Sequence, residues 1–249
     1  MSVNGGKDKD PTRVGIAAVD MGTGLYTCVA ILMALLEREK SNQGQYIDMT
    51  LYDCAIALMH PHVSNYYLSG GKVPEITGNQ HSNLAPYDKF STKTVDIFVA
   101  AGNNPAFRKL CKELGNPELS KDSRFLNNPD RLANISDLRD ELSELMKNVN
   151  GEDLCKRLLL AGIPAGPVHN TEQVMNHPHS IHRNMAAELD WYKGTGIPIK
   201  FSRTPGSINS PPPKFSEHAR SILAEHGFSD AEIDSLAADR ALVEERNKL

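Results

Sequence analysis

The sequence has no hydrophobic run long enough to cross a bilayer, no excess of basic residues and no charged-then-apolar leader. Its main apolar run, residues 25–36, is shorter than the roughly 20 residues that a spanning helix needs. The formal net charge of −4 provides no basic field for nucleic acid or for an anionic membrane surface. We therefore predict a cytoplasmic protein with neither a membrane nor a nucleic acid as partner.

The sequence also has no pair of cysteines or histidines with the CxxC or HxxxH spacing typical of a metal site. The four cysteines include no CxxC pair, and three of them lie within apolar helical patterns, as reduced cysteines in an intracellular protein core do. His60 and His62 flank a proline, where surface or packing roles are more common than metal binding. His177, His179 and His182 lie in a turn-rich stretch, and their irregular spacing does not suit a tetrahedral site. We expect no bound metal.

What the sequence does contain is an apolar segment, residues 12–36, with a single acid, Asp20. Residues 14–19 are expected to form a strand or an extended lead-in. Residues 25–36 are apolar on nearly every face, which predicts a helix buried on all sides.

Asp20 has two interpretations. An Asp directly before a helix is most often an N-cap and nothing more, since its carboxylate can accept from unpaired backbone N–H groups. The neighbouring Gly22 and Gly24 favour a functional role instead, because glycine lets the atoms of another molecule approach the backbone. Composition alone leaves both interpretations open.

The remaining pattern predicts an α/β protein. Residues 46–51 alternate like a short strand, and residues 53–67 predict a helix that kinks or restarts at Pro61. Residues 69–87 form a long irregular segment rich in Gly, Pro and Asn, typical of a linker or a functional loop. Strands are then expected over 94–101 and 185–191, and helices over 104–114, 136–149, 151–161 and 216–226.

Six blocks in order resemble the class III CoA-transferases, the family that includes carnitine-CoA and formyl-CoA transferases. The blocks are RVGIAAVDMGTGLY, ALLEREKSNQGQYIDMTLYD, GNQHSNLAPY, IFVAAGN, AGIPAGPV and SRTPGSINSPPP. The resemblance starts at Thr12 and covers almost all of the chain that follows. It implies the α/β fold of that family, with a Rossmann-like large domain and a smaller α/β domain.

The resemblance also implies the site and its chemistry. The aspartate of the D-x-x-x-G segment, here Asp20 followed by Gly24, is the nucleophile in that family. It attacks the thioester of an acyl-CoA, and CoA passes to an acceptor carboxylic acid through aspartyl anhydride and thioester intermediates. No cofactor is implied beyond coenzyme A as substrate. Residues of second rank are Gly78, Asn79 and His81 of the 70–82 loop and Leu51, which could line the CoA pocket.

Family chains begin with a Rossmann-like half that supplies most CoA contacts, and we expect this half to be absent here. Residues 12–68 and 192–249 would then belong to an incomplete large domain, and residues 69–191 to the small domain. The expected partners are acyl-CoA, a carboxylic acid, and either a second copy of the chain or a polypeptide that carries the other half. We expect the isolated chain to bind CoA weakly or not at all and to transfer no acyl group. The apolar residues 25–36 should drive self-association or need a partner that covers them.

Two other functions stay open. The same fold includes acyl-CoA racemases, but their glycine-dense segment after the aspartate is interrupted here by Met21 and Thr23, as in the transferases. The chain could also be a catalytically incomplete fragment or subunit that acts as an oligomerisation partner.

Overall fold

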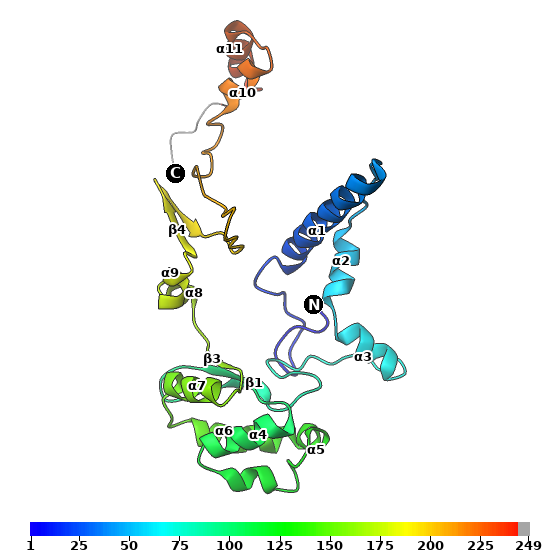
Figure 1. The fold of residues 1–249 in the computed structure, drawn as a ribbon, viewed down its shortest axis with the longest axis vertical. Coiled ribbons are helices and arrows are strands. Elements are labelled where there is room, and N and C mark those ends of the chain that lie inside the picture. Colours follow the sequence, from blue (N-terminus) through cyan, green and yellow to red (C-terminus); the bar gives the residue numbers. More distant parts are fainter. Residues whose placement is uncertain (244–249) are drawn as a thin grey trace. The chain divides into compact units, whose positions relative to one another are not determined.

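The computed structural model describes residues 1–243, which fall into two compact units divided between Val168 and His169. Helices and strands are mixed in the described chain, which confirms the predicted α/β class (Figure 1). The first unit contains α1 (Ala18–Ser41), α2 (Leu51–Leu58), α3 (His62–Leu68), β1 (Tyr87–Phe90), β2 (Ile97–Ala100), α4 (Asn104–Glu113), the 3₁₀ helix η1 (Pro117–Lys121), α5 (Asn128–Ala133), α6 (Ile135–Met146), α7 (Gly151–Leu160) and β3 (Ala165–Pro167). The second contains α8 (Thr171–Met175), α9 (Pro178–His182), β4 (Ala186–Leu189), β5 (Tyr192–Thr195), α10 (Ala219–Glu225) and α11 (Asp230–Ala238).

The hydrophobic core of the first unit lies between residues 85 and 163. Its antiparallel sheet has the order β1-β2-β3, with Tyr87 opposite Ala100 and Phe90 opposite Ile97. Burial alternates along β1 and β2, as expected for strands with one face toward a core. Within helices α4, α6 and α7 each buried apolar residue lies three or four positions from another one, which places them on one face of the helix. These residues are Phe107, Leu110, Cys111, Leu138, Leu142, Met146, Leu154, Cys155 and Leu158.

Local caps explain where these helices begin. The side chains of Asn103 and Asn150, which precede α4 and α7, accept from main-chain N–H groups three residues later. Pro105 follows in the first turn of α4, where its missing N–H is not needed. These signals are local in sequence, and the helices predicted over 104–114, 136–149 and 151–161 are all present within a few residues.

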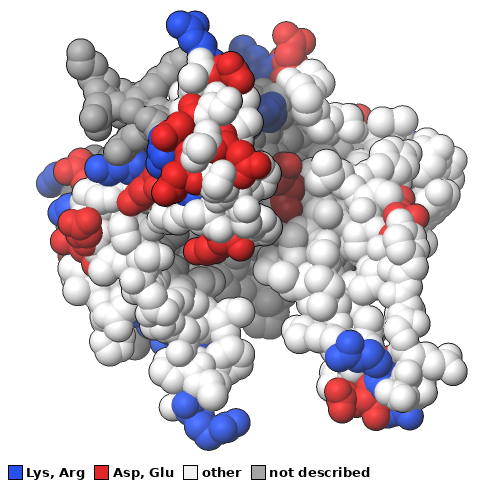
Figure 2. Space-filling view, turned by 90° about the horizontal axis from the view of Figure 1, so that it is seen from above, with Lys and Arg blue, Asp and Glu red and all other residues white. Residues whose placement is uncertain are grey.

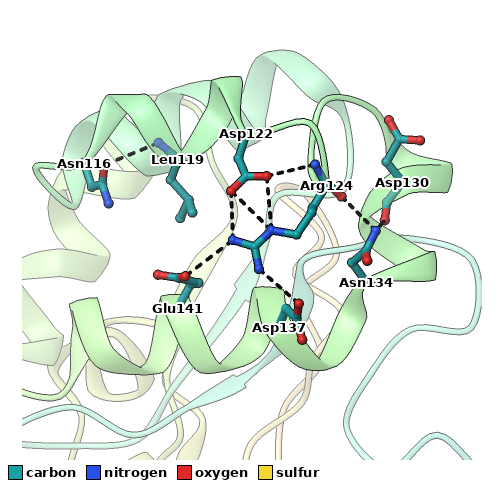
Figure 3. Close-up of polar contacts among 8 residues, drawn as sticks. All are labelled: Asn116, Leu119, Asp122, Arg124, Asp130, Asn134, Asp137 and Glu141. Atoms are coloured by element: carbon teal, nitrogen blue, oxygen red, sulfur yellow. Dashed lines mark hydrogen bonds and ion pairs between the residues drawn. The ribbon is translucent and has the colours of Figure 1, made fainter.

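An exposed arginine joins the segment after η1 to α6 (Figure 3). Arg124 forms ion pairs with Asp122 at 2.8 Å, Asp137 at 3.0 Å and Glu141 at 3.6 Å. Its hydrogen bonds to Asp122 hold the pKa of that carboxyl below its usual range. Asn134 donates to the carbonyls of Arg124 and Asp130 and closes the same turn. Because the side chain of Arg124 is 40% exposed, this network connects the two segments at the surface and not inside the core.

Two strands expected in the N-terminal part are not present. Of the two alternatives for residues 14–19, a strand or an extended lead-in, no strand forms: residues 14–17 lie outside helices and strands, and the helix begins at Ala18. Residues 46–51 form no strand either; they are mostly exposed, no other strand pairs with them, and α2 begins at Leu51. The helix expected over residues 53–67 is interrupted near Pro61, as predicted, and gives α2 and α3.

The prediction that the apolar helix is buried is also wrong. Within the described chain α1 has no buried residue, and its large apolar side chains are exposed, including Leu25, Val29, Leu32, Met33 and Leu36. The reason is a shortage of partners: α1 packs along α2, which covers only one side of it. Gly22 permits this approach, since a Cβ at that position would lie 2.8 Å from Cδ1 of Leu58.

The length of α1 also differs from the prediction. The apolar run of residues 25–36 belongs to a helix of 24 residues, which is long and apolar enough, by length and composition only, to cross a membrane. A core helix of a soluble protein meets the same criterion.

The bare surface of α1 is expected to make the purified chain self-associate, because large apolar patches on a soluble protein favour contact with one another. Sedimentation velocity over a range of concentrations should show reversible oligomers. The double substitution Leu25→Glu, Leu32→Glu, both at exposed positions, should shift the distribution toward monomer. A wild-type chain that stays monomeric at high concentration would contradict this prediction.

The second unit consists of small elements. β4 and β5 form a hairpin with Ala186 opposite Thr195, where the sequence predicted a strand over residues 185–191. Helix α11 begins with a capping box in which Ser229 and Glu232 satisfy each other's main-chain N–H groups. Residues 204–213, rich in proline, form neither helix nor strand.

The division into segments 12–68, 69–191 and 192–249 stays a prediction, and limited proteolysis tests it. We expect the first cuts within residues 69–84 and 204–213, which are largely exposed and outside helices and strands. Cuts between residues 94 and 165, where the core lies, should come later. Early cleavage within α6 or α7 would argue against an autonomously stable central part.

Candidate functional site

Asp20 is an exposed residue in the first turn of α1. It is not the N-cap, because the helix starts two residues earlier and its cap position, Ala17, offers no side-chain hydrogen bond. Among the described residues the Asp20 carboxylate has no hydrogen-bond or ion-pair partner. Its position places it near the positive end of the helix dipole, which attracts negative charge.

Gly22 and Gly24, which flank this turn, differ in their surroundings. Gly22 is used for packing against α2, as described above, so the space beside it is occupied. A Cβ added at Gly24 would meet nothing within 4 Å. Gly24 lies four residues after Asp20 and therefore on the same face of the helix. The backbone beside Asp20 is accessible to a second molecule at Gly24 and not at Gly22.

The loop residues Gly78 and Asn79 are exposed. Gly78 has a φ of +69°, a conformation that favours glycine, and a Cβ there would lie 3.3 Å from the main-chain nitrogen of Lys7. The loop thus turns sharply where the N-terminal segment passes it.

His81, in contrast, is held firmly. Its main-chain N–H donates to the carbonyl of Tyr87 at 3.1 Å, and its ring meets the Tyr87 ring edge to face with centroids 5.0 Å apart. Its Nδ1 accepts from the main-chain N–H of Asn83 at 3.0 Å. The imidazole therefore has a defined orientation as well as a defined position.

The same loop borders two cavities within the first unit. One, of about 770 Å³, is lined by polar and charged residues that include Lys7, Lys9, Lys72, Thr77 and His81, with Asp8 and Glu75 among them. A neighbouring cavity of about 480 Å³ lies against α3 and is lined partly by Asn65, Ser69 and Asn83. Both have the volume of small-molecule sites.

The predicted site residues are not joined to one another by direct contacts. Leu51 is the first residue of α2 and is 52% exposed. Within the part of the chain that the structure describes, no hydrogen bond or ion pair connects Asp20 with Gly78, Asn79 or His81. The loop residues form one group beside the cavities, while Asp20 and Leu51 lie on α1 and α2.

The sequence did not point to two residues of α5 that anchor this loop. Arg131 is fully buried and donates to the carbonyls of Ala85 at 2.6 Å, Phe125 at 3.1 Å and Gly102 at 3.0 Å. It also donates to Asn104 and lies 4.7 Å from the centroid of the Phe107 ring. Burial lowers the pKa of its guanidinium. The carbonyl oxygens and the face of the Phe107 ring stabilise its positive charge.

Asn128, three residues earlier on α5, contacts the loop on both sides of Leu84. Its Oδ1 accepts from the N–H of Ala85 at 3.0 Å, and its Nδ2 donates to the carbonyl of Asn83 at 2.8 Å. The run Asn127-Asn128-Pro129 is a recognisable helix start, but nothing in it indicates a partner more than 40 residues away.

The cysteines differ in accessibility. Cys54, Cys111 and Cys155 are buried and Cys28 is exposed. Burial raises the pKa of the Cys111 thiol to about 12, so that it stays protonated at neutral and mildly alkaline pH. Burial likewise raises the pKa of Cys155. Among the described residues no cluster of three or more His, Cys, Asp or Glu side chains could hold a metal ion.

We expect thiol reagents to modify Cys28 in the native chain well before the other three cysteines, because Cys28 is exposed and the other three are buried away from solvent. For Cys111 and Cys155 the raised pKa also disfavours the thiolate, which is the reactive form. Peptide mapping after iodoacetamide treatment checks this order. The Cys28→Ser variant should then react only after denaturation. Rapid native labelling of Cys111 or Cys155 would contradict the packing described above.

Charged side chains of both signs are interspersed on the surface drawn in Figure 2, and broad areas of it have neither. The lysines that line the larger cavity are likewise accompanied by acids. This distribution gives no single strongly basic face on that view.

Comparison with known proteins identifies the family. The model of CoA-transferase family III matches residues 1–219, and the chain belongs to that family. It is 34% identical over 230 residues to a succinate–glutarate CoA-transferase of Agrobacterium fabrum and 32% identical over 234 residues to human succinyl-CoA:glutarate CoA-transferase, in both cases over 90% of this chain. A crystal structure of a CaiB/BaiF family protein from Brucella suis matches 90% of this chain with a TM-score of 0.73 and 38% identity.

The chain spans about half the length of these relatives: 57% of the Agrobacterium protein, 52% of the human protein and 59% of the Brucella chain. The fold class predicted from the sequence blocks is thereby confirmed as that of the class III CoA-transferases.

Proposed function

We propose that this chain functions in a CoA-transferase that moves CoA from an acyl-CoA to a carboxylic acid, and that Asp20 is the nucleophile. The observation that supports it most directly is the exposed, unpartnered Asp20 carboxylate one helical turn before the open backbone at Gly24, in a chain of CoA-transferase family III. A nucleophile must be accessible and must not be neutralised by a permanent ion pair, and Asp20 meets both requirements.

The proposed reaction has four balanced steps. The Asp20 carboxylate attacks the thioester carbonyl, the C–S bond breaks, and CoA thiolate leaves behind a mixed anhydride. The thiolate then attacks the Asp20 carbonyl, releasing the first acid and forming an aspartyl-CoA thioester. The acceptor carboxylate displaces CoA thiolate to form a second anhydride. Attack by the thiolate on the acceptor carbonyl completes the new acyl-CoA and frees Asp20.

The acceptor is proposed to be a dicarboxylic acid. Relatives are named for transfer to glutarate, mesaconate, oxalate and citramalate, all of which carry two carboxylates. In this proposal Gly78, Asn79 and His81 belong to the loop that closes over the reacting groups, and Leu51 lines the CoA pocket. Anhydride chemistry needs such a cover, because water would hydrolyse the intermediates.

We also propose where the enzyme acts, which cofactor it needs and with which partner it assembles. It acts in the cytoplasm without a cofactor other than CoA as substrate, and it works as a homodimer or paired with the region that its relatives carry in addition. The exposed apolar surface of α1 supports the need for such a partner.

A chimaera tests the function. This chain would replace the matching region of the Agrobacterium succinate–glutarate CoA-transferase, so that the rest of the relative's length is present. Conversion of succinyl-CoA and glutarate to glutaryl-CoA, followed by liquid chromatography, is the expected result. The chain alone is expected to give no turnover. A folded, soluble chimaera without transferase activity toward any of the four acids named above would refute the proposal.

A further inference from the structure

The hydrogen bond at Nδ1 determines which proton the His81 ring carries. Because Nδ1 accepts from the Asn83 N–H, it cannot carry a hydrogen itself, and the neutral ring is the Nε2–H tautomer. Nε2 forms no hydrogen bond within the described chain, and His81 is one of the residues that line the 770 Å³ cavity. His81 therefore offers one N–H donor at the cavity, in an orientation set by its contact with Tyr87.

The tautomer depends on the position of the Asn83 main chain, which contacts with the side chains of Asn128 and Asn65 hold in place. Nδ2 of Asn128 donates to the carbonyl of Asn83 at 2.8 Å, and Oδ1 of Asn128 accepts from the main-chain N–H of Ala85 at 3.0 Å. The Asn83 side chain forms a reciprocal amide pair with Asn65 of α3, with distances of 3.3 and 3.1 Å. The loop is thus tied to α5 through its main chain and to α3 through a side chain.

We propose that His81, as the Nε2–H tautomer, donates a hydrogen bond to a carbonyl or carboxylate oxygen of the ligand in this cavity, and that Asn128 is the positioning residue that maintains this tautomer. The class of ligand rests on the proposed function: an acyl thioester or a dicarboxylic acid presents such oxygens, and their negative charge grows during transfer. A fixed donor aimed at that charge needs no reorganisation when it develops.

Nitrogen NMR on the chain labelled with ¹⁵N-histidine tests the geometry without any need for activity. The His81 signals are assigned by their loss in His81→Gln. The expected spectrum is that of an Nε2–H ring in the wild type and of exchanging tautomers in Asn128→Ala. Asn127→Ala is the matched control, since Asn127 caps α5 by accepting from Asp130 at 3.2 Å and has no bond to the loop. An Nδ1–H ring in the wild type, or an Asn128→Ala spectrum equal to that of Asn127→Ala, overturns the inference.

Ligand contact is tested with sodium glutarate as the probe. Its addition should shift the His81 Nε2 signal in the wild type and in Asn127→Ala, and the shift should be weaker in Asn128→Ala. An unmoved signal at saturating glutarate, together with an unmoved signal in the presence of succinyl-CoA, overturns the assigned role.

Activity of the chimaera separates this inference from the proposed function. His81→Phe keeps an aromatic ring beside Tyr87 but removes the donor, and it should lower kcat by about 10²-fold, whereas His81→Gln, which retains an N–H, should recover part of that loss. Asn128→Ala should lower kcat by about tenfold with little change in KM, and Asn127→Ala should leave both unchanged. An active chimaera in which His81→Phe is equally active refutes the inference and leaves the proposed function intact. An inactive chimaera refutes the proposed function, and the glutarate titration still decides whether His81 is a ligand donor.

Discussion

Arg131→Met is expected to cost about 3–5 kcal/mol of unfolding free energy, the largest effect of any single substitution considered for this chain. Methionine keeps much of the volume, but the carbonyls of Ala85, Phe125 and Gly102 would lose their donor inside a site that excludes water. Each buried acceptor left without a partner costs about 1–3 kcal/mol. Arg131→Lys should not restore stability, since one ammonium cannot reproduce the fork of a guanidinium.

Hydrogen exchange followed by mass spectrometry, as a function of urea, is the suitable measurement. The only tryptophan, Trp191, lies outside the core unit, so its fluorescence would not report on these contacts. Peptides from residues 85–165 should lose protection at much lower urea in Arg131→Met. Arg124→Met is the matched control, because its ion pairs lie at the surface, where solvent screening leaves them little weight in stability. Equal losses of hydrogen-exchange protection in the two variants would show that the buried contacts of Arg131 contribute little to the free energy of unfolding.

Asp20→Asn is expected to abolish CoA transfer in the active chimaera, with a loss of at least about 10³-fold, while the fold stays intact. Asn keeps the size of the side chain and removes the nucleophilic carboxylate. Because Asp20 is exposed, is not the helix cap and has no partner in the described structure, the substitution should cost less than about 1 kcal/mol, chiefly the loss of a charge near the helix N-terminus.

The control is Asp53→Asn, which removes another exposed acid from the first turn of a helix, α2, and should leave transfer unchanged. Hydroxylamine offers a direct check of the intermediate, because it converts an aspartyl thioester to a hydroxamate. In the presence of acyl-CoA this modification should map to the peptide that contains Asp20 in the wild type and disappear in Asp20→Asn. Full activity in Asp20→Asn, or a hydroxamate on a different residue, would assign the nucleophile elsewhere.

Elements whose signals are local could be predicted from the sequence. Helices α4, α6 and α7 follow from apolar spacing of three and four residues, and α4 and α7 also from their Asn caps, all within a dozen residues. The family resemblance likewise rests on short ordered blocks. Asp20, expected directly before the helix, is instead the third residue of α1, since Ala17 and Ala18 give no boundary signal and the helix starts without a side-chain cap.

The environment of each element, in contrast, depends on how the chain packs and could not be predicted from the sequence. An apolar helix such as α1 is buried only where neighbours cover it, and its sequence could not show that within the described residues α2 covers only one side of it. The difference between Gly22 and Gly24 is of the same kind, because it depends on where Leu58 lies. Asn128 and Arg131 contact a loop 43 to 46 residues earlier in the chain, and the tautomer of His81 depends on that contact. Such pairings bring distant residues together through the folded core, and no periodicity within either segment encodes them.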